Sequence, residues 1–87
     1  MVLFIVCVRD SATQAYGRPF FVNALGQALR SFSDEINNPE GGDLHRHPSD
    51  FELYHIGVYD DQLANLEPTQ PPVLLARGKD CVQPAKA

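Results

Sequence analysis

Hydrophobic residues in this chain form one continuous run, one helical stripe and one alternating stretch. The run, Val2–Arg9, is apolar at both strand parities, which predicts a central strand with both faces covered. In Ala24–Ile36, apolar residues recur at the i, i+3 and i+4 spacing of an amphipathic helix, and Asn23 predicts its N-cap. Phe51–Tyr59 alternates like a second strand, in which Gly57 indicates a bulge or a close approach of another backbone.

The segments between these elements are rich in turn-forming residues. They predict a loop at 10–19, a short extended piece at 19–22, a polar loop at 40–49, a hairpin turn at 60–62, a short strand at 63–66, a proline-rich loop at 67–72 and a last short strand at 73–77. The expected fold is therefore α+β: a small single-layer sheet of three to four strands packed by one helix, in the order β-α-β-β-β. We assign residues 1–79 to a single domain and residues 80–87 to a flexible C-terminal tail.

The length of 87 residues limits how much apolar surface the chain can bury by itself. One helix covers only one face of a sheet, whereas the strand predicted at Val2–Arg9 is apolar on both faces. A second copy of the chain is the economical source of the missing cover. We therefore expect a homo-oligomer that associates through the sheet.

Charge is unevenly distributed along the chain. The formal net charge of −4 combines +2 in residues 1–33, −8 in residues 34–67 and +2 in residues 68–87. This balance excludes indiscriminate coating of duplex DNA, which needs several Lys or Arg on phosphates, but it leaves room for one small basic surface. No apolar run approaches the roughly 20 residues that span a bilayer, no secretory signal is evident, and two cysteines make no disulfide framework. We expect a cytosolic protein without membrane contact.

Cationic and aromatic side chains are close together in sequence at the end of the first predicted strand. Single-stranded nucleic acid is held by such a mixture, because aromatic rings stack on bases and arginine neutralises phosphate. The candidate nucleic-acid-binding residues are Arg9, Tyr16, Arg18, Phe20, Arg30, Arg77 and Lys79. The last three join the others only if the fold brings the two basic ends together. The alternative is that Phe20 and the neighbouring Phe21 are core residues and that the arginines are ordinary surface residues.

One other group of residues has the composition of a metal site. This group is Asp43, His45, His47 and Asp50. The two histidines, at a spacing of two on an extended segment, would point the same way and could share a metal. The alternative is a solvated loop. His55 lacks a recognisable catalytic partner, and the sequence has no phosphate-binding loop, dinucleotide fingerprint or nucleophile elbow. We expect no catalytic residue, metal or cofactor, and a small metal-dependent enzyme remains the enzymatic alternative.

Four motifs occur in order along nearly the whole chain. They are FIVCVRD at 4–10, YGRPFFV at 16–22, GQALRSFSDEIN at 26–37 and PSDFELYHIGVYD at 48–60, followed by a proline-rich strand. Over about residues 3–80 this set resembles the small nonstructural protein of gokushovirus-type microviruses, the icosahedral single-stranded-DNA phages. The resemblance implies a DNA-binding or DNA-replication accessory protein. Its implied partners are single-stranded or replicative-form viral DNA, together with phage replication or procapsid proteins.

Two functions follow from the residues and the resemblance together. The first is a non-enzymatic phage accessory protein in the host bacterial cytoplasm, which binds DNA, in single-stranded form by preference. It would support viral genome replication, the switch to single-stranded DNA synthesis, or packaging. The alternative is a protein-interaction module that contacts replication or capsid proteins through its acidic middle or an exposed sheet edge, without binding DNA.

Overall fold

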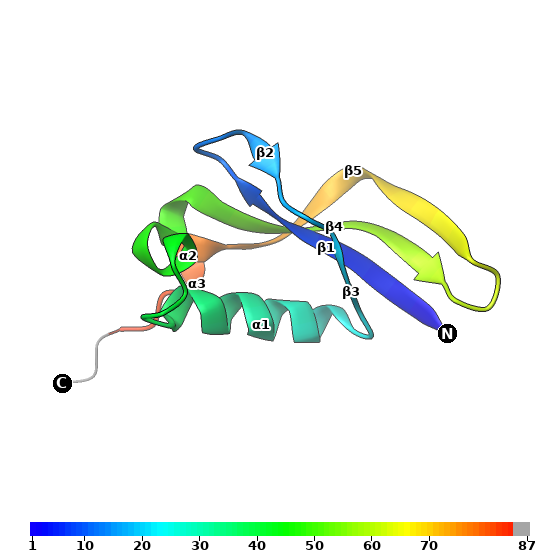
Figure 1. The fold of residues 1–87 in the computed structure, drawn as a ribbon, viewed down its shortest axis with the longest axis horizontal. Helices are drawn as coiled ribbons and strands as arrows, with labels where there is room; N and C mark the ends of the chain where they lie inside the picture. The colour runs from blue at the N-terminus through cyan, green and yellow to red at the C-terminus, as the bar shows by residue number, and fades with distance from the viewer. Residues whose placement is uncertain (85–87) are drawn as a thin grey trace.

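Five strands form one curled antiparallel sheet in the computed structural model, which describes residues 1–84 (Figure 1). The strands are β1 (Val2–Asp10), β2 (Ala15–Tyr16), β3 (Phe20–Val22), β4 (Phe51–Asp60) and β5 (Asn65–Arg77). β1 lies at the centre, with β2 and β3 paired along one side and β4 along the other, and β5 pairs with the far side of β4. The α+β class and the central position of the first strand are confirmed. The predicted order β-α-β-β-β with three to four strands is wrong, because the short strands β2 and β3 precede the helix and pair with β1.

Helix α1 (Leu25–Asn37) packs on one face of this sheet. Its buried stripe of Ala28, Phe32 and Ile36 forms the core together with residues of β1 and β4, such as Val6 and Leu53. The predicted helix is therefore confirmed, but the predicted N-cap at Asn23 is wrong.

Ala24 is the N-cap of α1. The side-chain oxygen of Gln27, in the first turn, accepts hydrogen bonds from the backbone N–H groups of Asn23 and Ala24, at 3.0 and 3.3 Å. The glutamine thus reaches back to satisfy donors just before the helix, as the fourth residue of a capping box does. The Asn23 side chain is not used as the cap.

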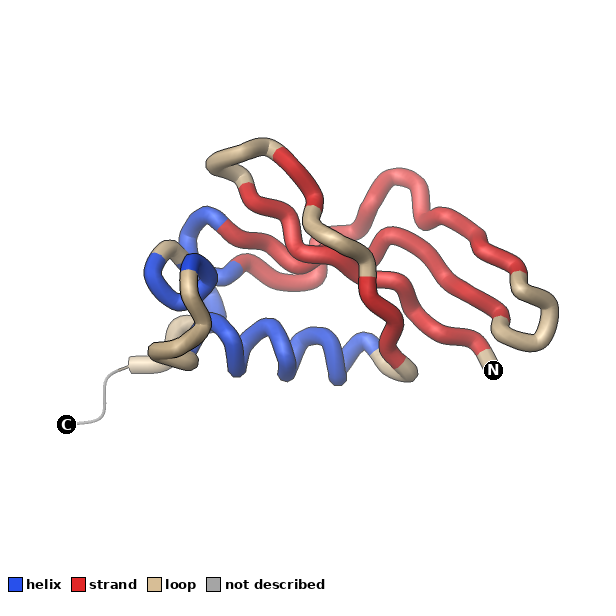
Figure 2. Tube along the Cα trace, viewed as in Figure 1, coloured by secondary structure: helices blue, strands red, loops and turns tan. Residues whose placement is uncertain are grey.

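Two segments predicted as loops contain short elements. β2 lies within 10–19, and the segment 40–49 contains α2 (Asp43–Arg46) and the start of the 3-10 turn η1 (Pro48–Asp50). The helical elements α1, α2 and η1 lie along one side and at one end of the strands, whereas β2 lies within the sheet (Figure 2). None of the helices in residues 1–84 combines the length and the apolar character needed to span a membrane.

The first residues of the predicted tail have regular structure. Asp80 and Cys81 belong to α3 (Gly78–Cys81), and the Asn37 amide ties this segment to α1. Asn37 donates to the Cys81 carbonyl and accepts from the Gln83 N–H, both at 2.9 Å. Residues 85–87 of the predicted tail lie outside the described residues.

The predicted loop at 67–72 is wrong, because β5 runs continuously through it. The pairing of β4 with β5 passes from Gly57↔Pro68 to His55↔Val73, so the intervening β5 residues form a large bulge. Prolines fit there because β5 is an edge strand in the described sheet, where one side of the backbone needs no ladder hydrogen bonds. The predicted close approach at Gly57 is confirmed, since a Cβ there would lie 2.8 Å from the Glu67 carbonyl oxygen.

The helix covers only part of the sheet. β1 and the β4–β5 hairpin extend past the start of α1, giving a molecule of 50 × 26 × 18 Å (Figure 1). On the face opposite α1, no helix within residues 1–84 lies over the central strands. This face carries most of the candidate functional residues.

Candidate nucleic-acid interface

Four side chains, those of Tyr16, Arg9, Glu52 and Arg77, form a row across the sheet, which we call the basic–aromatic row. Directly paired residues of an antiparallel sheet point to the same face. Arg9 of β1 pairs with Tyr16 on one side and with Glu52 on the other, and Glu52 pairs with Arg77 of β5. Leu53, which follows Glu52, is buried against the helix side, so this basic–aromatic row lies on the open face.

The side chains of the row contact one another. The Arg9 guanidinium lies 5.8 Å from the centre of the Tyr16 ring, within cation–π range. Tyr54 lies two residues after Glu52 on β4 and therefore points to the same face. Its ring contacts the Tyr16 ring edge to face, with 5.5 Å between the ring centres. Half of the Tyr16 surface is exposed, at 50%. The arrangement presents a ring and a cation side by side to solvent.

Glu52 joins the two arginines of the row. Its carboxylate oxygens lie 3.8 Å from Nη1 of Arg9 and 3.7 Å from Nε of Arg77. Burial raises the pKa of the Tyr54 phenol above its usual range, and the Glu52 charge adds to this shift. Tyr54 therefore stays neutral at physiological pH and can donate a hydrogen bond.

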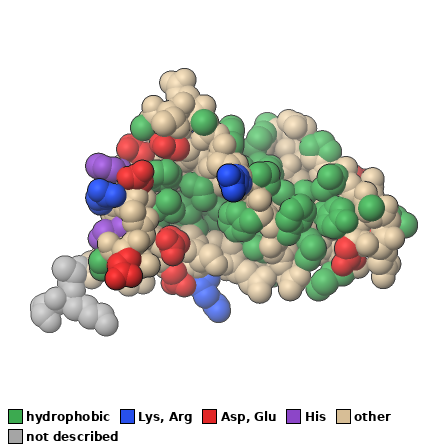
Figure 3. All heavy atoms as spheres, in the orientation of Figure 1, with side chains coloured by type: hydrophobic (Ala, Val, Ile, Leu, Met, Phe, Trp, Pro, Cys, Tyr) green, Lys and Arg blue, Asp and Glu red, His purple; other side chains and the backbone are tan. Residues whose placement is uncertain are grey.

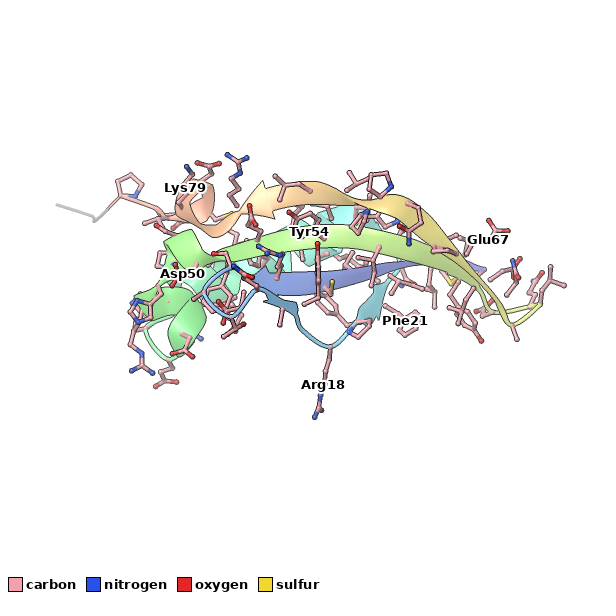
Figure 4. All side chains as sticks on the ribbon, turned by 90° about the horizontal axis from the view of Figure 1, so that it is seen from above. Arg18, Phe21, Asp50, Tyr54, Glu67 and Lys79 are labelled. Atoms are coloured by element: carbon pink, nitrogen blue, oxygen red, sulfur yellow. The ribbon has the colours of Figure 1, made fainter. Side chains whose placement is uncertain are left out.

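Two further cations flank the row. Figure 4 looks onto the open face, with Tyr54 at the middle of β4, Arg18 pointing away from one edge and Lys79 at the opposite edge. Lys79 and Arg77 line a polar pocket of about 430 Å³ together with Ser49 and Glu52. The two basic ends of the chain thus meet on one face, as the sequence interpretation required.

Two predicted site residues lie elsewhere. Phe20 pairs with buried Val6 and packs against the core on the helix side. Arg30 is exposed on α1, which covers the opposite face. Sequence reasoning also left out Tyr54 and Glu52. Their shared strand parity and the register of β4 against β1 place them beside Arg9, and that register was not available from the sequence.

The alternative of a metal site around His45 and His47 finds no support in the geometry of the described residues. His45 Nδ1 lies 2.9 Å from the Ile36 carbonyl oxygen, near the C-terminal end of α1. Across residues 1–84, no group of three or more His, Cys, Asp or Glu side chains is placed to hold a metal. Cys7 and Cys81 are free thiols, and burial raises the pKa of both.

Comparison with known proteins gives one family. The model of the family described as Phage ORF5 protein matches residues 3–81. Neither the curated proteins nor the solved structures contain a match to this chain. Because the family match spans nearly the whole sequence, the predicted phage origin is confirmed at the level of the family. The chain belongs to the Phage ORF5 protein family.

Proposed function

We propose that this phage protein binds single-stranded DNA without catalysing a reaction, and that it thereby supports viral genome replication, the switch to single-stranded DNA synthesis, or packaging in the host cytoplasm. The observation that carries the proposal is the basic–aromatic row on the open sheet face. There an exposed tyrosine, a second tyrosine and two arginines stand on adjacent strands.

The chemistry of the row suits a flexible, unpaired strand. Stacking of a base on an aromatic side chain contributes about 1–3 kcal/mol and depends little on sequence. Arg9 and Arg77 lie beside the tyrosines and on the carboxylate of Glu52, and Lys79 lines a pocket with Arg77 and Glu52, so three cations lie near this carboxylate, while Arg18 points away from the opposite edge of the sheet (Figure 4). This local excess of positive charge contrasts with the formal charge of −4 of the whole chain.

The proposal is tested by fluorescence anisotropy with a labelled single-stranded oligothymidylate at several salt concentrations. Tyr16→Ala is expected to weaken binding by about 5- to 150-fold, which corresponds to the stacking of one base. Arg77→Ala is expected to lower the salt dependence by about 0.7 in log–log slope, the value for one phosphate contact on single strands.

Arg30→Ala is the matched control, because it removes the same charge from the helix face. It is expected to leave binding within about twofold of the unmodified protein. Equal losses for Arg30→Ala and Arg77→Ala, or an affinity that does not change with salt, would contradict a DNA site on the open face.

The alternative is a protein-interaction module that acts without DNA contact, through the acidic middle or an exposed sheet edge, and β5 is poorly suited to the second of these. The edge strand β5 carries Pro68, Pro71 and Pro72, which have no N–H to donate to an added strand. Copurification from infected cells with and without nuclease separates the two functions. A partner that is retained after nuclease treatment favours the protein-interaction module, and one that is lost favours DNA.

A further inference from the structure

A polar pocket lies at the end of the basic–aromatic row, where β5 ends and α3 begins. Its volume is about 430 Å³, within the range of small-ligand sites, and its lining residues are Ser49, Glu52, Arg77 and Lys79. Figure 3 shows that charged side chains and histidines gather mainly at the end of the molecule that carries α2 and α3, whereas hydrophobic side chains cover the centre and the opposite end. The pocket therefore belongs to the charged end of the molecule.

Close packing of two backbone segments fixes the positions from which these side chains extend. Gly78, which begins α3, is buried, and a Cβ there would collide with the carbonyl oxygen of Pro48. Ser49 directly follows Pro48 in η1, and both cations of the pocket are neighbours of Gly78 in sequence. A site on segments that are already packed together loses less entropy when a ligand binds.

The two cations of the pocket are available to a ligand. The contacts of Glu52 with Arg9 and Arg77 measure 3.8 and 3.7 Å, longer than the roughly 2.7–3.2 Å of a hydrogen bond. No carboxylate of residues 1–84 forms an ion pair with the Lys79 ammonium. Arg77 and Lys79 are both exposed, so their N–H groups can bind a ligand from solvent.

The charge of this cluster favours one class of ligand. Three cations, Arg9, Arg77 and Lys79, lie near a single carboxylate, so two positive charges are in excess. A phosphomonoester carries about 1.5 to 2 negative charges at pH 7, whereas a phosphodiester of the DNA backbone carries about one. Arginine can bind a phosphate through two parallel N–H groups, and a serine hydroxyl can donate a further hydrogen bond. A phosphomonoester therefore matches the charge and the donors of the pocket.

We propose that this pocket binds a phosphomonoester, with the phosphate between Arg77 and Lys79 and with the Ser49 hydroxyl donating to it. Such a group occurs at a phosphorylated end of a DNA strand and on a free nucleotide. For the strand end the inference rests on the proposed function, because the strand then continues from the pocket along the row. The row crosses from β5 to β2, so about 14 Å, three strand spacings, separate the pocket from Tyr16. A short strand anchored in the pocket can thus stack its bases on Tyr54 and Tyr16.

The test is isothermal titration calorimetry of the full chain with unlabelled ligands. Pentathymidylates with a 5′-phosphate, a 3′-phosphate or hydroxyl groups at both ends are compared, and thymidine monophosphate is compared with thymidine. A phosphorylated ligand is expected to bind about 3- to 30-fold more tightly than its hydroxyl counterpart, the range for two exposed ion pairs. A phosphorylated strand that binds more tightly than the nucleotide identifies a strand end as the ligand, and equal affinities identify a free nucleotide.

Variants of the lining residues test whether the pocket causes this preference. Lys79→Met is expected to lower the preference for phosphate by about 2- to 5-fold, the range of one exposed ion pair, and Lys79→Arg to keep it. Ser49→Ala leaves the charge unchanged and is expected to lower the preference by about 2- to 10-fold, the range of one hydrogen bond. Arg30→Met is the matched control, because it removes one charge from the helix face, and it is expected to keep the preference.

Equal affinities for phosphorylated and hydroxyl ligands in both series would overturn the proposal. The same holds for a Lys79→Met variant that keeps the full preference, or for an Arg30→Met variant that loses as much of it. The DNA proposal fails separately, if the pentathymidylate with hydroxyl ends does not bind. In that case the comparison of thymidine monophosphate with thymidine still tests the pocket by itself.

Discussion

Glu52 is the residue whose replacement tests the basic–aromatic row most directly. Its carboxylate neutralises Arg9 on β1 and Arg77 on β5, at 3.8 and 3.7 Å. Glu52→Gln removes this charge, keeps the size of the side chain and leaves both arginines without an anionic partner. If DNA lies on the row, its phosphates replace the lost carboxylate, so Glu52→Gln is expected to bind single-stranded DNA more tightly.

The size of this gain follows from the one positive charge that Glu52 neutralises. Each phosphate neutralised on a single strand contributes about 0.7 to the slope of log affinity against log salt. Loss of the carboxylate frees one net positive charge, so it steepens the slope by up to about 0.7. Extrapolated from equal affinities at 1 M salt, this is a gain of up to about 5-fold at 0.1 M. The cost to folding is small, because partly exposed ion pairs contribute about 1 kcal/mol or less.

Anisotropy titrations of Glu52→Gln from 0.05 to 0.5 M salt measure the affinity for single-stranded DNA and the slope of log affinity against log salt. Glu35→Gln is the matched control, since it removes the same charge from an exposed position on α1. Its slope is expected to equal that of the unmodified protein. An affinity of Glu52→Gln that stays unchanged or falls, in a protein with unchanged melting temperature, would refute the placement of DNA on this row.

Three further predictions concern the fold. Ile36→Ala, at a side chain 2% exposed in the core, is expected to lower the free energy of unfolding by about 2–5 kcal/mol in urea titrations. Gly78→Ala places a Cβ against the Pro48 carbonyl and should lower the melting temperature, whereas Gly26→Ala adds a methyl group in open space on α1 and should stabilise by up to about 1 kcal/mol. Because burial raises the pKa of the Cys7 thiol, the folded protein retains that proton at higher pH than the unfolded chain. In a Cys81→Ser variant, which removes the other free thiol, Cys7 should therefore react slowly with Ellman's reagent at pH 8 until urea is added. Stability should fall as the pH rises above about 9. Fast reaction of this variant in its native state would contradict the burial of Cys7.

The strongest periodic patterns predicted their elements because burial determines them. Val2–Arg9 is a central strand, and its middle residues are buried whichever face they point to. α1 follows from an apolar stripe that has one sheet face to cover. The proline-rich segment was misread because proline excludes a residue from the interior of a sheet, but not from the outer side of an edge strand. Its place at an edge depends on strand order, which local sequence does not carry.

The candidate site was predictable only in part, for the same reason. Neighbouring residues of a strand point to opposite faces, so Phe20 and Phe21 cannot both be core or both be surface. The sequence interpretation chose Phe20, whereas the pairing of β3 with β1 puts Phe20 on the helix side and Phe21 on the open face. Tyr54 likewise becomes a neighbour of Tyr16 only through β1, which lies between their strands.

The prolines of β5 also affect how the protein behaves at high concentration. A sheet with an open edge can add further copies without limit and grow into a fibril, since each added strand presents a new edge. Three prolines on the exposed strand disfavour the first step of this growth, because each removes an N–H that an added strand would need. The exposed apolar side chains of the sheet are thereby kept apart from a continuous edge on which strands could be added.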